Sequence, residues 1–576
     1  MYGKQNVLST GKTNSTQSWL IDLFFMISLL GIFYALWIGG HALFTPDEGR
    51  YSEIAREMVV TGDYITPRLN GVAFLDKPVL YYWLQASAIQ LFGLKEWALR
   101  FWPAFMGVLG CVLTYFTGRT LFNRRTGILA AVILATSPLY YGAAHYANLD
   151  LEVAVLISIT LFFSVLALHA ESTKRQVLFF ILAYIFCGLA ALTKGLIGIV
   201  FPAMIMGLWI LMLNRFHVIK QMRLVTGLIL FLAITIPWYY LVQQANPEFL
   251  HFFFVTQQIS RFLTHGDFNN KTALWFYIPV VLAGFFPWSF FAIQAVIKNV
   301  KAVWNDRKSH SAELFLLLWL VLIFIFFSIP TSKTVGYIIP IFPALALMVG
   351  HYLDSQWEMG LTKSFKAGVI GFVIASYIFS MAASTITWLS LLPITKAAIP
   401  YLTLASSAFL IAATIAWKLL KKGKSARIFY CIAAMAVTGL LILSASTGVI
   451  NDKSIKPVAL SLKPKLKPTD EMVAYYKYYQ DLPIYLERRI TIVADWTAPD
   501  IIKKDNWLRE MWFGMPFQNT KDWLINDEAF WQRWNSNKRL FVIMNKDYYA
   551  TFAEKAKDTI HQYGSYNDVV WVANQV

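Results

Sequence analysis

The sequence predicts a polytopic α-helical membrane protein with a small α/β domain at its C-terminal end. Hydrophobic residues make up 57% of the chain and charged residues only 14%, whereas a soluble protein carries about a quarter charged residues. Apolar runs long enough to cross a bilayer recur up to Ile450. After that residue, short β-like runs alternate with Trp-rich stretches. These observations predict a membrane domain over residues 1–450 and a separate domain over residues 451–576.

The apolar windows predict about thirteen transmembrane helices. The first run, Leu20 to His41, is too long for the core of a cleaved signal peptide, so we expect it to be a permanent span. The predicted windows are 20–40, 101–122, 127–145, 151–169, 177–193, 195–213, 224–243, 273–297, 312–328, 335–350, 366–390, 401–417 and 428–447.

The basic residues predict how these helices are oriented. The segment Pro78–Gly93 is ambiguous, because it is apolar but interrupted by polar and aromatic residues. If it lies along the interface, all the large clusters of Lys and Arg between the other spans fall on the same side as the N-terminus. The positive-inside rule favours that arrangement, with the N-terminus in the cytoplasm and the C-terminal domain outside. Residues 42–100 then form the first outer loop, with Pro78–Gly93 as an interfacial helix.

The C-terminal region predicts a linker followed by a compact domain. The segment Lys453–Lys467 is rich in Lys and Pro and is typical of a linker. Three later runs are typical of strands, namely Ile490–Ala494, Leu540–Met544 and Val569–Ala573. The sequence therefore predicts an α/β domain of about a hundred residues.

The cysteines and the net charge exclude two classes of function. All three cysteines fall inside apolar runs, so neither a disulfide framework nor a cysteine metal site is indicated. The net charge of +17 is explained by Lys and Arg that fix topology and meet anionic lipids. We therefore expect membrane lipids, and not nucleic acid, as partners.

Ionisable residues gather on the predicted outer side of the membrane, where they suggest a functional site. The first outer loop contains carboxylates and cations close together in sequence, and further polar residues occur where later spans emerge on the same side. Two carboxylates and several cations therefore converge on one membrane face. The candidates are Asp47, Glu48, Arg50, Asp76, Lys77, Tyr82, Asp150, Lys194, Arg261, His265 and Tyr337.

Simpler structural roles are open for several of these residues. Asp47 follows Pro46 and is a candidate helix cap, and Asp150 is a candidate cap for the fourth span. The pair Asp76–Lys77 can be a solvated pair at the start of an interfacial helix, and Lys194 with Gly195 can form a hairpin turn. Two histidines in one loop, such as His251 and His265, are a weak metal signal.

Carboxylates and cations at one membrane face suit chemistry on a sugar linked to a lipid phosphate. Lys and Arg can hold the phosphate and stabilise the charge that builds on it as the glycosidic bond breaks. Carboxylates can orient the acceptor, act as a base or stabilise an oxocarbenium-like centre.

The first outer loop also resembles that of a known family. The run Phe44-x-Pro46-Asp47-Glu48-x-Arg50-Tyr51, continuing through Glu53 to Met58, is similar to the lipid A aminoarabinose transferases. That family belongs to the GT-C membrane glycosyltransferases related to protein mannosyltransferases. Further similar segments lie over most of the chain, namely Thr61–Asp63, Pro67–Gly71, Lys77–Pro78, Leu149–Asp150, Leu192–Gly195, Ser260–Phe262, Ser332–Lys333, Tyr337–Pro340 and Asp481–Leu486.

The resemblance implies roles for the candidate residues. It implies thirteen spans with a periplasmic α/β domain, and Asp47 and Asp150 as the catalytic carboxylates. It implies that Lys77 and Arg261 bind the polyprenyl phosphate, with Arg50 and Tyr337 in the same cavity. Glu48, Tyr82 and Lys194 are possible further lining residues.

No cofactor is expected for catalysis. Some relatives bind a structural zinc, for which Asp76 and His265 are the candidates here. Asp76 stands where relatives often carry Glu, and Val79 where they often carry a second Pro, so the shorter Asp76 side chain weakens the case for zinc.

The expected activity is that of an inverting glycosyltransferase in the bacterial inner membrane. Its donor would be an undecaprenyl-phosphate-linked sugar, 4-amino-4-deoxy-L-arabinose or a similar aminosugar, and its acceptor a lipid A phosphate. One alternative is a protein O-glycosyltransferase of the same fold. Another is a flippase or transporter of lipid-linked sugars, which would place ionisable residues near the bilayer midplane.

Overall fold

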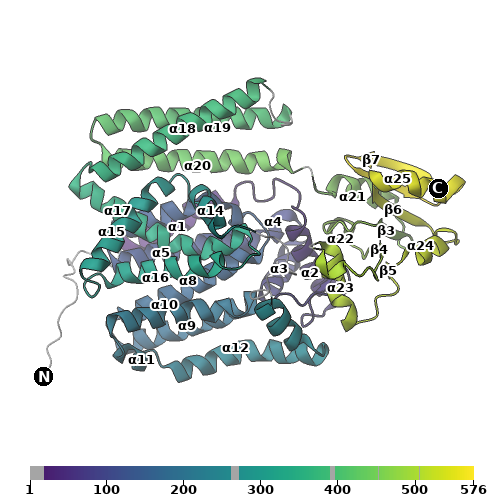
Figure 1. Ribbon diagram of the computed structural model, residues 1–576, viewed down its shortest axis with the longest axis horizontal. Coiled ribbons are helices and arrows are strands. Elements are labelled where there is room, and N and C mark those ends of the chain that lie inside the picture. Colours follow the sequence, from purple (N-terminus) through teal and green to yellow (C-terminus); the bar gives the residue numbers. More distant parts are fainter. Residues whose placement is uncertain (1–17, 261–271, 390–395, 452, 505, 576) are drawn as a thin grey trace.

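The computed structural model describes residues 18–260, 272–389, 396–451, 453–504 and 506–575. Long helices form the membrane domain, and the C-terminal domain sits at one end of it (Figure 1). Between the two lie the helices of the first outer loop, α2 (Asp47–Thr61), α3 (Leu80–Phe92) and α4 (Glu96–Leu99). The outer loop is thus enclosed between the two domains.

Each of the thirteen predicted windows coincides with a helix or with a bent pair of helices. Among the described residues, nine helices are long and apolar enough to cross a membrane. Two shorter apolar helices, α1 (Ser18–Ala35) and α10 (Ile197–Leu213), occupy two further windows. The number of spans itself stays a prediction. The nine are α5 (Phe101–Leu121), α8 (Leu149–Leu168), α9 (Thr173–Lys194), α12 (Leu224–Ala245), α16 (Ser311–Ser328), η3 with α17 (Val335–Ile341 and Phe342–Met359), α18 (Lys363–Leu389), α19 (Ile399–Lys421) and α20 (Ser425–Ile450).

Two of the windows predicted as spans consist of two helices with a sharp bend between them. Helices α6 (Arg124–Ala135) and α7 (Pro138–Ala144) meet at 67°. The second pair, η2–α14 (Leu274–Gly284) and α15 (Ser289–Asn305), is bent by 115°. Pro138 begins α7, and Pro287 lies in the second break. Proline lacks the backbone N–H that a continuous helix would need at these points, which explains both breaks.

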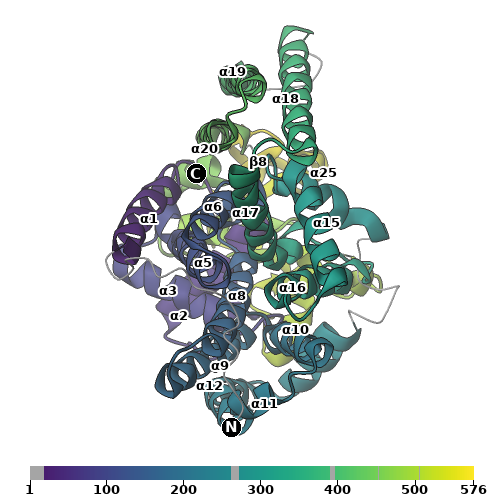
Figure 2. The same ribbon diagram turned by 90° about the vertical axis from the view of Figure 1, so that its left-hand side faces the viewer.

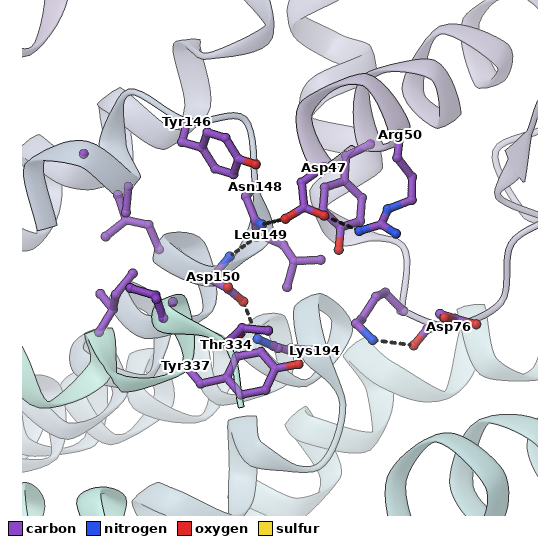
Figure 3. Close-up of a pocket in the computed structure, with 18 of the residues that line it drawn as sticks. Asp47, Arg50, Asp76, Tyr146, Asn148, Leu149, Asp150, Lys194, Thr334 and Tyr337 are labelled. Atoms are coloured by element: carbon purple, nitrogen blue, oxygen red, sulfur yellow. Dashed lines mark hydrogen bonds and ion pairs between the residues drawn. The ribbon is translucent and has the colours of Figure 1, made fainter. Parts of the chain in front are cut away.

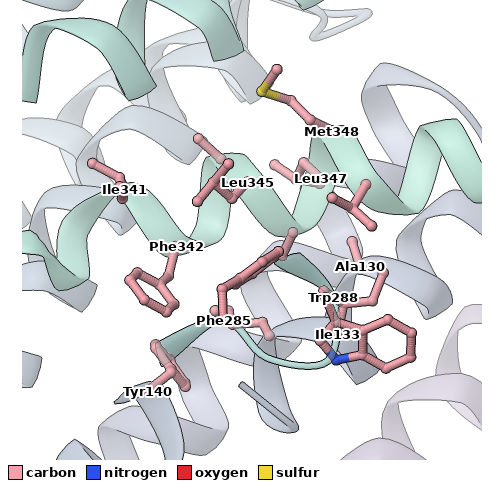
Figure 4. Packing of buried hydrophobic residues seen from close by; sticks show 14 of the residues in the cluster. Ala130, Ile133, Tyr140, Phe285, Trp288, Ile341, Phe342, Leu345, Leu347 and Met348 are labelled. Carbon is pink, nitrogen blue, oxygen red and sulfur yellow. The ribbon is translucent and has the colours of Figure 1, made fainter. Parts of the chain in front are cut away.

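The centre of the membrane domain is a closely packed apolar core. Helix α17 packs against α6, and its Phe342 points toward Phe285 in the bend before α15, with ring centroids 5.6 Å apart (Figure 4). The indole N–H of Trp288 donates to the hydroxyl of Thr136 over 2.9 Å, which satisfies a polar group inside this core. Helices α18, α19 and α20 form an outlying layer on one side of the core (Figures 1 and 2).

Helix α3, the ambiguous Pro78–Gly93 segment, is too short to cross a bilayer. Its 13 residues give a length of about 20 Å, against a hydrocarbon thickness of about 30 Å. It packs against α2, burying Tyr81, Tyr82 and Gln85. The structure therefore agrees with a segment that does not span.

The C-terminal domain is built on a six-stranded sheet with the strand order β5-β4-β3-β6-β8-β7. The first four of these are parallel neighbours, and β8 and β7 add to β6 in antiparallel fashion. The three predicted strands are present as β4, β6 and β8, whereas β3, β5 and β7 were not predicted. The strands are β3 (Glu471–Tyr475), β4 (Thr491–Val493), β5 (Leu524–Ile525), β6 (Leu540–Asn545), β7 (His561–Tyr566) and β8 (Val569–Ala573).

The predicted linker Lys453–Lys467 is instead mostly helical. It contains α21 (Lys456–Leu462), which buries Val458, Ala459 and Leu462 against the rest of the chain. Proline at the first helical turn and apolar residues spaced three and four apart favour such a helix. The Lys and Pro residues that suggested a linker lie on the exposed face of α21 and at its ends.

Both faces of the sheet are covered. Alternate strand residues point to opposite faces, so Val473 and Tyr475 pack with α24 (Asp527–Trp534) and α25 (Lys546–Ala556). Met472 and Ala474 point the other way, into a core shared with α22 (Leu482–Leu486), α23 (Trp507–Gly514) and the first outer loop. The C-terminal domain and the outer loop therefore share one hydrophobic core.

Hydrogen bonds between side chains and backbone groups fix this docking. The side chain of Asn70 bonds both the N–H and the C=O of Ile490, each over 2.8 Å. The N–H of Leu43 donates to the hydroxyl of Tyr485 over 2.9 Å. At Gly49 on α2, an added Cβ would lie 2.7 Å from the backbone nitrogen of Asp481, so only glycine allows this close approach.

Replacing Gly49 by Ala should loosen the contact between the C-terminal domain and α2. The added methyl group meets backbone atoms that cannot move aside, and such overpacking costs about 1–3 kcal/mol. We expect a lower melting temperature in detergent and faster proteolytic release of the C-terminal domain. Gly31→Ala is the matched control, because its Cβ would have no atom within 4 Å. Equal melting and proteolysis of the two variants would show that the close approach does not matter.

Candidate active site

A cavity of about 460 Å³ lies where the outer loop, the membrane helices and the C-terminal domain meet. Its walls come from α2, the connection between α7 and α8, the end of α9, η3 and α23 (Figure 3). Charged residues of both signs line it, together with apolar residues of α7 and α8. The charged lining residues are Asp47, Arg50, Asp76, Lys77, Asp150, Lys194, Arg509 and Glu510.

Asp47 is the first residue of α2 and points into this cavity (Figure 3). The capping position of α2 is occupied by Pro46 and not by Asp47. Instead, one carboxylate oxygen pairs with Arg50 and the other accepts a hydrogen bond from the side-chain amide of Asn148 over 3.3 Å. Asp47 is therefore not a helix cap, and its carboxylate is held by groups on two separate elements.

Asp150 is likewise not a helix cap. Asn148 caps α8, because its side chain accepts from the backbone N–H of Asp150 over 2.9 Å. The carboxylate of Asp150 pairs with Lys194, whose ammonium lies 4.0 Å from the ring centre of Tyr337. Lys194 is the last residue of α9, where a cation interacts favourably with the helix dipole. Together these contacts fix the second carboxylate opposite Asp47.

Arg50 joins the membrane domain to the C-terminal domain. Its guanidinium pairs with Asp47 on one side and with Glu510 of α23 on the other. Glu510 also accepts a hydrogen bond from Gln480 over 2.9 Å. The side chain of Arg50 is only 12% exposed, whereas Asp47 and Glu510 keep exposures of 31% and 20%, so both ion pairs are partly buried. The C-terminal domain thus supplies part of the active-site wall.

Asp76 and Lys77 line the same cavity, and Asp76 lies well apart from Asp150 in it (Figure 3). The ammonium of Lys77 donates to the backbone carbonyl of Asp76 over 3.2 Å. The carboxylate of Asp76 accepts from the side-chain amide of Gln257, over 3.3 Å, and Gln257 lies on η1 (His251–Ser260). Asp76 and Lys77 are therefore part of the cavity wall and not merely a solvated pair.

Glu48 and Tyr82 do not line this cavity, so the prediction for these two residues is wrong. Glu48 is fully buried and pairs with the fully buried Arg100 through two contacts of 2.7 Å. Burial alone would raise the pKa of Glu48, but the Arg100 guanidinium holds that pKa below its usual value. Tyr82 is fully buried behind Tyr51. Successive helix residues point in directions about 100° apart, so Glu48 cannot face the cavity beside Asp47.

Two further candidates, Arg261 and His265, lie outside the described residues. Among the residues that the structure does describe, no group of three His, Cys, Asp or Glu side chains could hold a metal ion. A zinc site at Asp76 and His265 therefore remains an untested prediction.

Comparisons with known proteins agree with this geometry. Residues 22–253 match the family model described as dolichyl-phosphate-mannose-protein mannosyltransferase. Residues 458–574 match the aminoarabinose transferase C-terminal domain. The crystal structure of ArnT from Cupriavidus metallidurans bound to undecaprenyl phosphate superposes with a TM-score of 0.82 at 25% identity, covering 97% of this chain and 98% of that one.

Curated relatives carry a corresponding name, undecaprenyl phosphate-alpha-4-amino-4-deoxy-L-arabinose arabinosyl transferase. The protein from Erwinia tasmaniensis is 29% identical over 528 residues, which cover 89% of this chain and 91% of the relative. The protein from Pectobacterium carotovorum is 33% identical over 344 residues, 59% of this chain and 60% of the relative.

The chain belongs to the aminoarabinose transferase family. It is therefore a multi-pass membrane glycosyltransferase of the GT-C type, as the resemblance of the first outer loop implied. In this aminoarabinose transferase family member, the cavity described above is the candidate active site.

Several lining residues were not predicted from the sequence. Asn148 has a local signal, since an Asn two residues before an acid at the start of an apolar run is typical of a helix cap. Tyr146, Arg509, Glu510 and Phe513 have no comparable signal. Glu510 lies 460 positions from Arg50 in the chain, and only the folded structure brings them together.

Removing the charge of Glu510 should lower activity by weakening the placement of Arg50. In Glu510→Gln, Arg50 loses one of its two carboxylate partners, and we expect turnover to fall about tenfold, which corresponds to ~1.4 kcal/mol. Because Glu510 acts through Arg50, KM for the donor should change less than kcat. The control is Glu554→Gln on α25, an exposed acid remote from the cavity. Wild-type kcat in Glu510→Gln would show that this contact does not position the active site.

Proposed function

We propose that this protein transfers an aminosugar, 4-amino-4-deoxy-L-arabinose or a close analogue, from undecaprenyl phosphate to a phosphate of lipid A. The supporting observation is the cavity itself, which is lined by the carboxylates of Asp47 and Asp150 and by Lys77. The relatives are named for an undecaprenyl phosphate donor that carries this aminosugar. Both substrates are lipids, which fits a site enclosed between membrane helices and an outer domain.

Lys77 has the charge needed for the donor phosphate. A phosphate diester in the donor carries one negative charge, and the departing undecaprenyl phosphate carries a second. A cation beside the leaving oxygen therefore binds the transition state more tightly than the ground state, which accelerates bond cleavage. Arg261 is proposed to act with it.

The acceptor chemistry needs no strong base. A lipid A phosphate monoester is already ionised at neutral pH, so one of its oxygens can attack the anomeric carbon directly. As that bond forms, the bond to the donor phosphate oxygen breaks with inversion, and the electron pair stays on undecaprenyl phosphate. Charge balances without a proton transfer, so Asp47 is proposed to orient the substrates and stabilise positive charge on the sugar ring.

The two alternatives predict different behaviour. A protein O-glycosyltransferase would need Asp47 to remove a proton from a hydroxyl acceptor. A flippase would need ionisable residues along a path through the membrane, whereas the described carboxylates of the cavity lie at the end of the bundle next to the C-terminal domain (Figure 1). Mass spectrometry of lipid A from cells with and without the gene tests the proposal. Unchanged lipid A, with sugar found on a protein, would favour the first alternative.

Asp47→Asn and Lys77→Ala should separate catalysis from donor binding. Asp47→Asn keeps the shape of the side chain but removes its charge, so turnover should fall by orders of magnitude, with ~1.4 kcal/mol for each tenfold loss. Its affinity for undecaprenyl phosphate should remain close to wild type. Lys77→Ala should lose both affinity and turnover. Lys77→Arg should rescue only in part, because a planar fork does not replace a compact ammonium.

Equilibrium binding of undecaprenyl phosphate to the purified variants provides the measurement. Wild-type affinity in Lys77→Ala would place the phosphate elsewhere, with Lys194 or Arg50 as the next candidates. Near-normal turnover in Asp47→Asn at equal protein level would remove Asp47 from the proposed chemistry.

We also propose that the protein lies in the inner membrane with the cavity on the periplasmic side. The support is the asymmetry of charge, since the loops between spans carry clusters such as Arg124–Arg125 and Lys421–Lys422 at the opposite end. At that end Arg124 also pairs with Asp22 of α1 over 2.6 Å.

Cysteine labelling in whole cells tests this orientation. In a variant without the three native cysteines, Thr61→Cys and Lys95→Cys should react with an impermeant reagent added outside, provided that it passes the outer membrane. Both positions are exposed and flank α3. Lys422→Cys should react only after the inner membrane is permeabilised. Labelling of Thr61→Cys but not of Lys95→Cys in intact cells would mean that α3 crosses the membrane.

A further inference from the structure

A second cavity, of about 200 Å³, lies at the junction between the two domains and has no part in the proposed reaction. It is formed by α4 and by the residue that precedes it, together with α21 and α22 of the C-terminal domain (Figure 1). Apolar and charged residues both line it, and the charged ones are called its rim below. The apolar residues are Leu43, Leu94, Leu99, Leu460 and Ile484, and the polar ones are Lys95, Glu96, Lys456, Lys463, Tyr485 and Glu487.

The rim has a surplus of positive charge. Lys456 pairs with Glu96 and Lys463 with Glu487, while the exposed Lys95 makes no ion pair with any described residue. The paired lysines keep side-chain exposures of 33% and 44%, so neither ammonium is enclosed by its partner. Each ammonium has three N–H donors. A single anionic group at the rim could therefore contact Lys95 and still leave both ion pairs in place.

The rim also lies close to the start of a candidate spanning helix. Lys95 immediately precedes α4, and the spanning helix α5 begins at Phe101. Around it, exposed apolar side chains project outward, including Leu91 at 72% and Trp97 at 37% exposure. The ring of Phe92 contacts those of Trp97 and Phe101, with centroid distances of 5.1 and 5.2 Å. Such an aromatic group beside cations is typical of the boundary between lipid chains and head groups.

We propose that this junction cavity binds the phosphate head group of an anionic phospholipid, such as phosphatidylglycerol. The head group contacts Lys95 and the neighbouring lysines through charge-assisted hydrogen bonds. One acyl chain lies against Phe92, Trp97 and the exposed face of α5. A membrane lipid fits better than a soluble anion, because the cation cluster adjoins a surface that only acyl chains would cover.

Such a lipid would join the two domains. It would contact α4 of the membrane domain and α21 of the C-terminal domain at once. Tyr485 in the same cavity accepts from the N–H of Leu43 and lies 3.4 Å from the carboxylate of Glu96. Leu43 is four residues before Asp47, so the lipid would stabilise the docking that also holds the start of α2. A ligand that binds only the docked state raises the melting temperature.

Native mass spectrometry and thermal melting of the purified full chain test this proposal. Wild type should retain phosphatidylglycerol in preference to phosphatidylcholine and should melt at a higher temperature with the former. Lys95→Gln, which breaks no ion pair, should bind phosphatidylglycerol about fivefold more weakly. The matched control is Lys366→Gln, an exposed lysine at the start of α18. It should bind like wild type.

Three results would overturn the proposal. Equal retention of the two lipids by wild type would remove the preference for an anion. Equal phosphatidylglycerol binding by Lys95→Gln and Lys366→Gln would place the lipid elsewhere. Stabilisation by glycerol 3-phosphate as strong as that by the lipid would indicate a site for soluble phosphates instead. Because every readout is binding or melting, these outcomes are independent of whether the proposed transferase activity is correct.

Discussion

The buried ion pair between Glu48 and Arg100 is the interaction on which the active site depends. Both side chains are fully buried, and transferring two such charges out of water costs several kcal/mol per ion. The arrangement offsets this cost with many hydrogen bonds. Glu48 also accepts from the backbone of Phe44 and Ala147, and Arg100 donates to the carbonyls of Ile38, His41 and Ala42. One ion pair therefore ties the end of α1, the start of α2, the start of α5 and the connection before α8. Asp47 directly precedes Glu48, and Asn148 directly follows Ala147. The same contacts therefore bring Asp47 and Asn148 together.

The charged residues of the cavity form ion pairs, and a bound substrate can take the place of one partner in a pair. Asp47 shares Arg50 with Glu510, and Asp150 is held by Lys194. In a partly buried site, an ion pair offsets part of the cost of removing each charge from water. When a phosphate enters, it can compete for a cation and leave a carboxylate available for the sugar. A preorganised set of opposite charges thus provides electrostatic stabilisation with little rearrangement.

The parts of the fold that follow local rules could be predicted from the sequence, and the parts that depend on long-range contacts could not. Apolar windows located every long helix, because hydrophobicity over some twenty residues is a local property. The bends at Pro138 and Pro287 could not be predicted in this way, because a proline can either end a helix or only kink it. Asp47, Lys77 and Asp150 were found because they lie in short, specific motifs. Glu48 was misplaced because its partner Arg100 is 52 residues away, and Glu510 was missed because nothing near it in the chain indicates a contact with α2.

The boundary between the membrane and C-terminal domains does not separate two functional units. Residues of the outer loop, such as Tyr51 and Val72, share a core with Leu482 and Ile492 of the sheet domain. The α23 helix of that domain contributes Glu510 and Phe513 to the cavity wall. An enzyme that takes its sugar from a lipid donor must open toward the bilayer, so membrane helices alone cannot enclose its reacting groups. A soluble domain docked on the outer loop covers a further side of the cavity, and reduced contact with water strengthens the electrostatic interactions there. The sheet domain is therefore best understood as the outer wall of the active site, and its docking as a condition of the chemistry.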